Sequence, residues 1–407
     1  MLRLKLHWQI FIALLLGILF GVYFKEYVSY VGWMGDLFLR ALGMIIIPLV
    51  LSSIVNGVAS IGNARNIGLL GMKTMIFYLS TSTLAILTGL IMVNIFKPGI
   101  DTGIQLTNES VLDVAEGTLG QTLLGIIPNN IFHAFSNNSQ MLSVIFFSLI
   151  FGYFISKTET KHQEILSGFF KAVFEVMMKI TLFVIRFTPL GIFGLIVSRI
   201  AAQSDLYLLM QSMGKYMFVV ISGILIHVFI TLPLIVKFIG KEKPFLHLAH
   251  VRTALITAFT TSSSNATLPL TMEAVRNNSG VSAKVTSFTL PIGATINMDG
   301  AALYECVAVI FIAQAYGIEL SISQQIVVVL TSLLASIGSA GIPMAGLVMI
   351  TIVLTAVGLP LEGVGLILAV DRIIDMFRTS ANVWSDVCGA IVIAKSEGEV
   401  LNDSGAS

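Results

Sequence analysis

The groups most suited to chemistry in this sequence are charged and polar side chains that interrupt an apolar run near its C-terminal end. At about 100° per residue, a helix over residues 370–386 gathers six of them within an arc of about 100°, opposite Ile, Met, Val and Ala. They are Asp371, Asp375, Arg378, Thr379, Asn382 and Asp386. A charge inside a bilayer costs at least roughly 2.5–3.5 kcal/mol, so such groups face inward and mark substrate or ion paths. One arginine cannot neutralise three aspartates, so we expect bound sodium ions or protons beside them.

A second candidate ion site lies in the apolar run 281–316. Asp299 follows Asn297 and precedes Gly300 there. This spacing favours an unwound turn whose backbone carbonyls would serve as hard oxygen ligands for alkali cations. A buried, hydrogen-bonded turn without an ion is the alternative.

Structural explanations also stay open for the other polar groups. Asp375 and Arg378 are three positions apart, so they could form an ion pair on one helix face that only stabilises the helix. Tyr78, Thr81 and Ser82 lie inside another apolar run. Taken alone, such hydroxyls are more typical of side chains that bond their own helix backbone.

The composition requires a membrane around these groups. Of 407 residues, 56% are hydrophobic and only 11% are charged, whereas a soluble chain carries roughly 25% charged residues. The net charge of +1 argues against a nucleic-acid partner, which needs clustered basic residues. A membrane-spanning helix needs about 20 apolar residues. Continuous candidates cover residues 8–24, 33–60, 69–96, 121–156, 163–200 and 206–239.

The loops between these runs carry a charge bias that predicts orientation. If the runs alternate, the basic residues of the N-terminus and of the 237–243 loop fall on one side. Segment 101–118 carries four acids and no Lys or Arg. Because positive loops stay cytoplasmic, we expect the first two segments inside and 101–118 outside. Pro189 is expected to kink the fifth run.

Two later segments, 251–275 and 325–358, each consist of two apolar halves that are too short to span a membrane. Polar tips separate the halves, TSSSNAT at 261–267 and SIGSAGIP at 336–343. Non-helical backbone at membrane depth persists only where protein or a cavity satisfies it. Two such interrupted segments in corresponding places point to a transporter site built from inverted repeats. Two kinked ordinary spans are the alternative.

Four motifs in this order resemble the dicarboxylate/amino acid:cation symporter family, which includes the excitatory amino-acid transporters and the archaeal sodium–aspartate symporters. They are TSSSNATLP at 261–269, PIGATINMDG at 291–300, SIGSAGIPMAG at 336–346 and the polar face of 371–386. The resemblance is detailed over roughly 245–400 and follows the order of the spans before that.

The resemblance implies an all-α membrane protein with eight transmembrane helices, two re-entrant helical hairpins and inverted repeats, working as an elevator-type homotrimer. The implied organisation is residues 1–68 for scaffold helices 1 and 2, 69–98 for helix 3 of the transport domain, 99–205 for scaffold helices 4 and 5, and 206–400 for the rest of the transport domain. After helix 6, that last part holds hairpin 1 (about 244–276), helix 7 (about 281–316), hairpin 2 as the gate (about 322–358) and helix 8 (about 363–395).

The same resemblance implies a site for an acidic amino acid, aspartate or glutamate. Ser264 and Asn382 would hold the α-carboxylate, in a serine run that also includes Ser262 and Ser263. Asp375, Thr379 and the carbonyls of Ser262 and Ile342 would hold the amino group. Arg378 would pair with the side-chain carboxylate, aided by the backbone of Gly346. Ala301 stands where acidic amino-acid carriers of the family usually have Thr, which leaves the choice between the two substrates open.

For cations, the resemblance implies about three sodium ions. The first would be held by Asp386 and the carbonyls of Gly293, Asn297 and Asn382. The second would be held by carbonyls of Thr295, Ser336, Ile337 and Ser339, near Met298. The third would be held by Tyr78, Thr81, Ser82, Asn297 and Asp299. We therefore expect a sodium-coupled symporter of the cytoplasmic (inner) membrane, with several spans and both termini in the cytoplasm.

Other functions are weighed against this one. A proton-coupled glutamate/aspartate carrier or a C4-dicarboxylate carrier of the same fold stays open, although a substrate without an amino group would leave Asp375 unpaired. A channel filter needs repeated rings around a pore, and the sequence offers one asymmetric constellation. An enzyme is not expected, because His133, His162, His227, His247 and His250 fall mostly at loops or edges, away from the serines.

Overall fold

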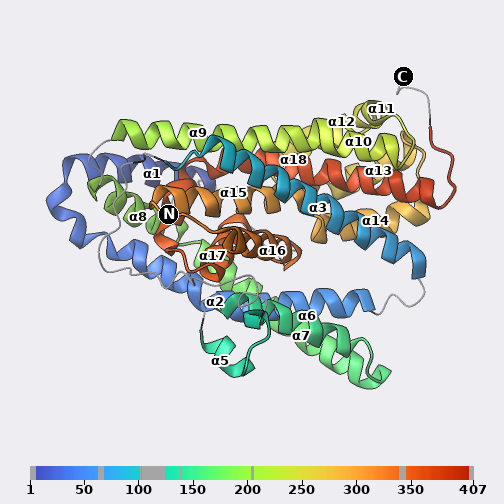
Figure 1. Ribbon diagram of the computed structural model, residues 1–407, viewed down its shortest axis with the longest axis horizontal. Helices are drawn as coiled ribbons and strands as arrows, with labels where there is room; N and C mark the ends of the chain where they lie inside the picture. Colours follow the sequence, from blue (N-terminus) through green and yellow to red (C-terminus); the bar gives the residue numbers. More distant parts are fainter. Residues whose placement is uncertain are drawn as a thin grey trace.

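The computed structural model describes residues 6–62, 68–100, 102, 124–137, 140–202, 206–338 and 345–402, and these residues form helices and connecting turns without strands. Figure 1 shows the long helices lying side by side, which agrees with the all-α expectation. Four helices are long and apolar enough to cross a membrane, or up to five if one bent pair counts as a span. The described residues thus form a helical protein with several apolar helices.

The N-terminal helices pack mainly on one another. α1 lies along α8, and α2 lies along α6, α7 and α8. Close approach of α1 to α8 depends on Gly21, where a side chain would meet Ile200. The bounds of these elements are α1 (Leu6–Tyr23), η1 (Lys25–Tyr30), α2 (Trp33–Gly62), α5 (Ile131–Ser136), α6 (Met141–Ile155), α7 (Thr160–Ile185) and α8 (Thr188–Ala202).

The predicted kink in the fifth run is present and lies slightly before Pro189. α7 ends at Ile185 and α8 begins at Thr188, and their axes differ by 53°. The pyrrolidine ring of Pro189 has no N–H to donate to the carbonyl four residues earlier, which is that of Ile185. The helix therefore ends at the residue that loses its hydrogen-bond partner.

In the second group of helices α15 is the most central, and its residues are buried almost throughout. α3, α9, α16, α17 and α18 all contact it. The bounds of the helices in this group are α3 (Gly68–Phe96), α9 (Leu206–Ile226), η3 (His227–Thr231), α10 (Leu232–Phe238), α11 (Pro244–His250), α12 (Arg252–Thr261), α13 (Ser264–Asn277), α14 (Ala283–Ile296), α15 (Asp299–Ala315), α16 (Ile322–Gly338), α17 (Ala345–Ala356), η4 (Leu361–Gly363) and α18 (Val364–Ser396).

The first of the two segments read as interrupted is interrupted in the structure. α12 ends at Thr261, Ser262 adopts the left-handed conformation with φ of 51°, and α13 begins at Ser264. α16 ends at Gly338 and α17 begins at Ala345, so the tip that carries Ser339 and Ile342 lies outside the described residues. α14 and α15 are separated by Asn297 and Met298 alone, which is the unwound turn expected in the run 281–316.

Candidate functional site

The break between α14 and α15 places Asp299 at the centre of a buried polar network. Its Oδ1 atom accepts a hydrogen bond from Ser82 Oγ at 2.6 Å, with Thr81 Oγ1 at 3.4 Å. Its Oδ2 atom accepts a hydrogen bond from Ser385 Oγ at 2.6 Å. Because Asp299 is fully buried, these donors from α3 and α18 replace the water that a carboxylate loses on burial.

His227 also reaches this carboxylate, which corrects the expectation that it lies at a loop or edge. Its Nε2 atom is 3.0 Å from Asp299 Oδ2, and its ring is buried. It occupies the first position of the π-helical turn His227–Thr231, inside the span formed by α9 and α10. Pro233 follows this turn and cannot donate to the carbonyl of Phe229, so the helix widens locally there. A spanning helix therefore supplies a titratable side chain to the site.

Asn297 connects Asp299 with the second buried acid of this region, Asp386. The Nδ2 atom of Asn297 donates to Asp386 Oδ1 at 2.9 Å and to Ser385 Oγ at 3.0 Å. Gly293 packs against both Asp386 and the hydroxyl of Tyr78, where a larger side chain would collide. The Tyr78 hydroxyl donates to the carbonyl of Thr289 at 2.9 Å.

The structure thus brings together seven of the side chains and backbone positions predicted to hold sodium. They are Tyr78, Thr81, Ser82, Gly293, Asn297, Asp299 and Asp386. Two buried carboxylates with hydroxyl and amide oxygens around them form a hard-oxygen environment suited to an alkali cation. Among the described residues, no group of three or more His, Cys, Asp or Glu side chains could hold a metal ion.

Most of the other predicted sodium residues lie at or just after the C-terminal ends of α14 and α16. The hydroxyl of Thr295 donates to the carbonyl of Ile292, and that of Ser336 donates to the carbonyl of Leu333. Met298 precedes α15 in a non-helical conformation. Ile337 belongs to the last turn of α16. The prediction for Ser339 falls outside the described residues, so this ion site stays a prediction.

Arg378 is the centre of the second cluster, on α18. Its Nη2 atom lies 2.7 Å from Asp375 Oδ1 and 3.4 Å from Asp371 Oδ1. The Tyr304 hydroxyl donates to Asp371 at 2.6 Å, and the guanidinium lies over the Tyr304 ring, 4.0 Å from its centroid. These contacts hold a buried cation, 4% exposed, by charge and by its aromatic neighbour.

One nitrogen of this guanidinium remains available. Arg378 Nη1 is buried and has no hydrogen-bond partner among the described residues. It faces Gly346 at the start of α17, where a Cβ atom would collide with it. A buried donor without an acceptor is costly, so this position is suited to an incoming anion. The structural pair of Asp375 with Arg378 is present, but it leaves this donor unsatisfied.

The remaining predicted substrate residues lie on helices that pack together. Asn382 Oδ1 accepts from the backbone N–H of Gly300 at 2.8 Å, which joins α18 to the start of α15. Thr379 is buried one turn earlier and donates to the Asp375 carbonyl. α12 and α13 contact α18.

At the junction of α12 and α13, the three serines of the run differ in their contacts. Ser262 has a buried hydroxyl with no partner among the described residues. Ser263 caps α13 by accepting from the backbone N–H of Ala266. Ser264 is the first residue of α13, and Ile342 lies outside the described residues.

Sequence reasoning missed four residues that the structure places in or beside these clusters. His227 and Ser385 contact Asp299, and Tyr304 contacts Asp371. Glu305 is fully buried on α15, and neither of its carboxylate oxygens has a hydrogen-bond partner among the described residues. The rule that flags an acid inside an apolar span applies to Glu305 and would have found it.

Comparisons with known proteins identify the family to which the chain is similar. The model of the sodium:dicarboxylate symporter family matches residues 6–396. The proton/sodium-glutamate symport protein of Geobacillus stearothermophilus is 37% identical over 99% of this chain and 97% of its own length. The proton/glutamate-aspartate symporter of Escherichia coli (strain K12) is 36% identical over 97% of this chain and 93% of its own length. Human excitatory amino acid transporter 3 is 35% identical over 94% of this chain and 84% of its own length.

Two tyrosines, one inside the Arg378 cluster and one outside it, give a matched test of this cluster. Replacing Tyr304 with Phe removes the hydroxyl that donates to Asp371, so we expect the free energy of unfolding to fall by roughly 1–2 kcal/mol. Tyr23 ends α1, outside this cluster, and its side chain is 74% exposed, so Tyr23→Phe is expected to be close to neutral. Thermal unfolding of the two purified variants checks this. Equal melting temperatures would mean that the bond to Asp371 contributes nothing to stability.

Proposed function

Because the chain belongs to the sodium:dicarboxylate symporter family, we propose that it carries glutamate or aspartate across a membrane by symport with sodium ions. It is a transporter rather than an enzyme. The observation that carries the proposal is the buried Arg378 guanidinium, whose Nη1 atom faces Gly346 and has no hydrogen-bond partner in the part of the chain that the structure describes.

An acidic amino acid would satisfy the groups around Arg378 better than they satisfy one another. Arg378 would bind the side-chain carboxylate through the unpartnered Nη1 atom, because a guanidinium pairs with a carboxylate in a bidentate geometry. Asp375, now 2.7 Å from Arg378, would turn to the α-ammonium together with Thr379. Ser264 and Asn382 would bind the α-carboxylate. Substrate would thus exchange one buried ion pair for two.

Sodium ions would neutralise the carboxylates of Asp299 and Asp386, which lie beyond Asn382 as seen from Arg378. Asp299 and Asp386 are buried within one network, with Asn297 between them. About three sodium ions remain our proposal, in sites formed by the residues named above. Asn382 contacts Gly300 next to Asp299 and also belongs to the proposed substrate face. Ion and substrate binding would therefore be coupled through shared geometry.

Protons are the second candidate for the coupling ion, and two observations favour it. Glu305 is buried without a partner for either oxygen among the described residues, a state that a carboxylate tolerates far better when it is protonated. His227 lies beside Asp299, inside the proposed ion site. The names of both bacterial relatives include protons, and that of the Geobacillus stearothermophilus protein also includes sodium. A dicarboxylate without an amino group is disfavoured, since it would leave Asp375 without a cationic partner.

We further propose that α1, α2, α6, α7 and α8 belong to a fixed scaffold and that α3 and α9–α18 belong to a transport domain that moves as an elevator. Support comes from the packing, because helices of each group contact mainly one another. The proposal also includes eight membrane spans, with hairpin 2 as the gate, and assembly as a homotrimer. The protein would lie in the cytoplasmic membrane with both termini inside the cell.

The coupling ion is tested by uptake into liposomes that contain the purified protein. We expect labelled aspartate and glutamate to accumulate when sodium is outside and potassium inside, without a pH gradient. Accumulation driven by a pH gradient in sodium-free buffer would favour the proton-coupled candidate.

The variant Glu305→Gln distinguishes the sodium-coupled from the proton-coupled candidate. It should leave sodium-driven uptake intact, and it should abolish uptake that is driven only by protons.

The assignment of Arg378 as the side-chain selector predicts a change of substrate. Replacing Arg378 with Cys is expected to abolish aspartate and glutamate binding and to permit a small neutral amino acid such as serine. Removing one side of a buried ionic contact costs roughly 3–5 kcal/mol, or about two to four decades in affinity. A competition assay on folded variant protein measures this. If the variant still prefers aspartate over serine, Arg378 does not select the substrate.

The assignment of Asp386 predicts a change in sodium dependence. Asp386→Asn keeps the shape of the side chain and removes the charge that a hard cation needs, while Arg378 stays intact. We expect the sodium concentration at half-maximal substrate binding to rise at least about tenfold, with aspartate still preferred over serine. Sodium titration of substrate binding checks this, and an unchanged midpoint would contradict the assignment. Thr83→Ala is the control, because Thr83 is only half-buried on α3 and its hydroxyl donates to the carbonyl of Leu79.

A further inference from the structure

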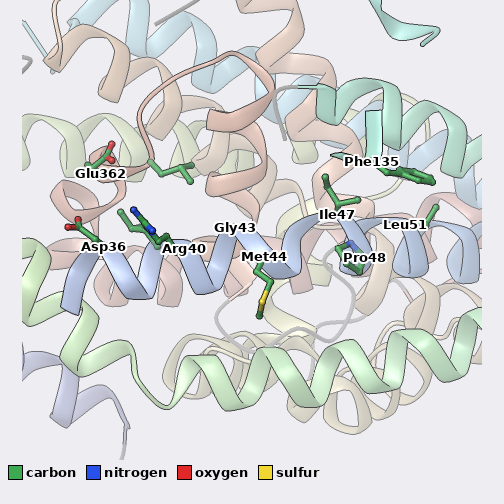
Figure 2. A pocket seen from close by; sticks show the side chains of 11 residues that line it. Asp36, Arg40, Gly43, Met44, Ile47, Pro48, Leu51, Phe135 and Glu362 are labelled. Carbon is green, nitrogen blue, oxygen red and sulfur yellow. The ribbon is translucent and has the colours of Figure 1, made fainter. Parts of the chain in front are cut away.

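A cavity of about 870 Å³ lies outside the clusters described above, between α2, α5 and η4 (Figure 2). Its two ends differ in chemistry. Asp36, Arg40 and Glu362 line one end, and mainly apolar side chains of α2 and α5 line the other. Its volume falls in the range of about 300–1,000 Å³ that is typical of small-molecule sites.

The polar end combines one cation with two acids. Asp36 and Arg40 are four positions apart on α2 and share a helix face, while Glu362 comes from η4. Figure 2 shows the three side chains gathered at the same end of the cavity. Among the described residues, no ion pair joins Arg40 to either acid. The three groups are therefore free to bind a ligand that carries both a negative and a positive charge.

The cavity as a whole is long enough for a headgroup followed by part of a hydrocarbon chain. Met44, Ile47, Leu51 and Phe135 line it, and Met44 is 66% exposed. The path along α2 from Asp36 to Leu51 is roughly 22 Å at 1.5 Å per residue. This length exceeds half of the roughly 30 Å hydrocarbon core of a bilayer. An occupant with a polar head at Asp36 and a tail at Leu51 would thus reach well into the membrane.

We propose that this cavity binds one phospholipid whose zwitterionic headgroup carries a primary ammonium. The phosphate lies at Arg40, the ammonium lies between Asp36 and Glu362, and one acyl chain lies against Met44, Ile47 and Leu51. Arginine binds phosphate through paired N–H donors. A primary ammonium donates three hydrogen bonds and so satisfies two carboxylates. A trimethylated headgroup has no such donors, and a purely anionic headgroup would meet two carboxylates of its own sign.

A lipid in this position joins two parts of the fold. Asp36 and Arg40 belong to α2, whereas Glu362 directly precedes α18, the helix that carries Arg378. Headgroup contacts to all three residues exist only while α2 and η4 lie together. The bound lipid therefore stabilises this arrangement over any arrangement in which the two elements separate.

The test is native mass spectrometry of the purified full-length chain, titrated with phosphatidylethanolamine, phosphatidylcholine or phosphatidylglycerol of identical acyl chains. We expect phosphatidylethanolamine to bind about tenfold more tightly than the other two. Arg40→Gln and Glu362→Gln should each lower its affinity about tenfold, which corresponds to loss of one charge-assisted contact. Ile47→Trp, which fills the apolar end, should weaken all three lipids. Lys25→Gln and Glu26→Gln remove exposed charges on η1, just before α2, and should change nothing.

Several results would overturn the proposal. Equal binding of the three lipids would show an unspecific apolar groove, and tighter binding of phosphatidylglycerol would show an anion site at Arg40. Variants that change the number of associated chains without changing lipid binding would show that another copy of the chain covers this face. Displacement of the lipid by aspartate would show a second substrate site. Lipid binding is measured without any ion gradient, so failure here leaves the proposed transport function untouched.

Discussion

The constraint on which the rest of the structure depends is the burial of ionisable side chains inside an apolar helical protein. Asp299 is the clearest case, because three helices besides its own contribute to its surroundings: Ser82 from α3, His227 from the span of α9 and α10, and Ser385 from α18. An isolated carboxylate in such a place would be very costly. The break after Ile296, the π-helical turn at His227 and the polar face of α18 all serve to bring partners to it.

The same constraint explains why the two functional clusters are neighbours. Arg378 and Asp386 lie on one face of α18, and the first turn of α15 lies against that face through Gly300. A cation bound near Asp386 and an anion bound near Arg378 would each reduce the cost of burying the other group. Charge balance thus links the two clusters before any movement is considered, which is a natural basis for symport of acidic amino acids.

Much of this could be predicted from sequence, for physical reasons that differ between elements. The polar face of α18 and the interrupted segments leave strong signals, since charges and short apolar halves are exceptional in membrane spans. Membership of the symporter family is confirmed by the comparisons. His227 gave no such signal, because a single histidine in a long apolar run can face lipid, protein or a loop. Its role depends on a register change at the π-helical turn, which arises from Pro233 and from packing with α3 and α18. The tip that holds Ser339 and Ile342 lies outside the described residues, so those predictions remain open.

The contact between Gly346 and Arg378 has a consequence for how such a protein diversifies. A Cβ atom at position 346 would collide with the guanidinium, so any larger residue there would have to displace Arg378 from its place beside Asp375 and Tyr304, and this restricts substitution at position 346. The restriction disappears once the arginine is replaced by a small residue, because the space in front of α17 then opens. The two positions are therefore epistatic: the order in which substitutions arrive decides which are tolerated. A lineage in which Arg378 is replaced first would then tolerate substitutions at position 346 as well, so two positions could alter the substrate site.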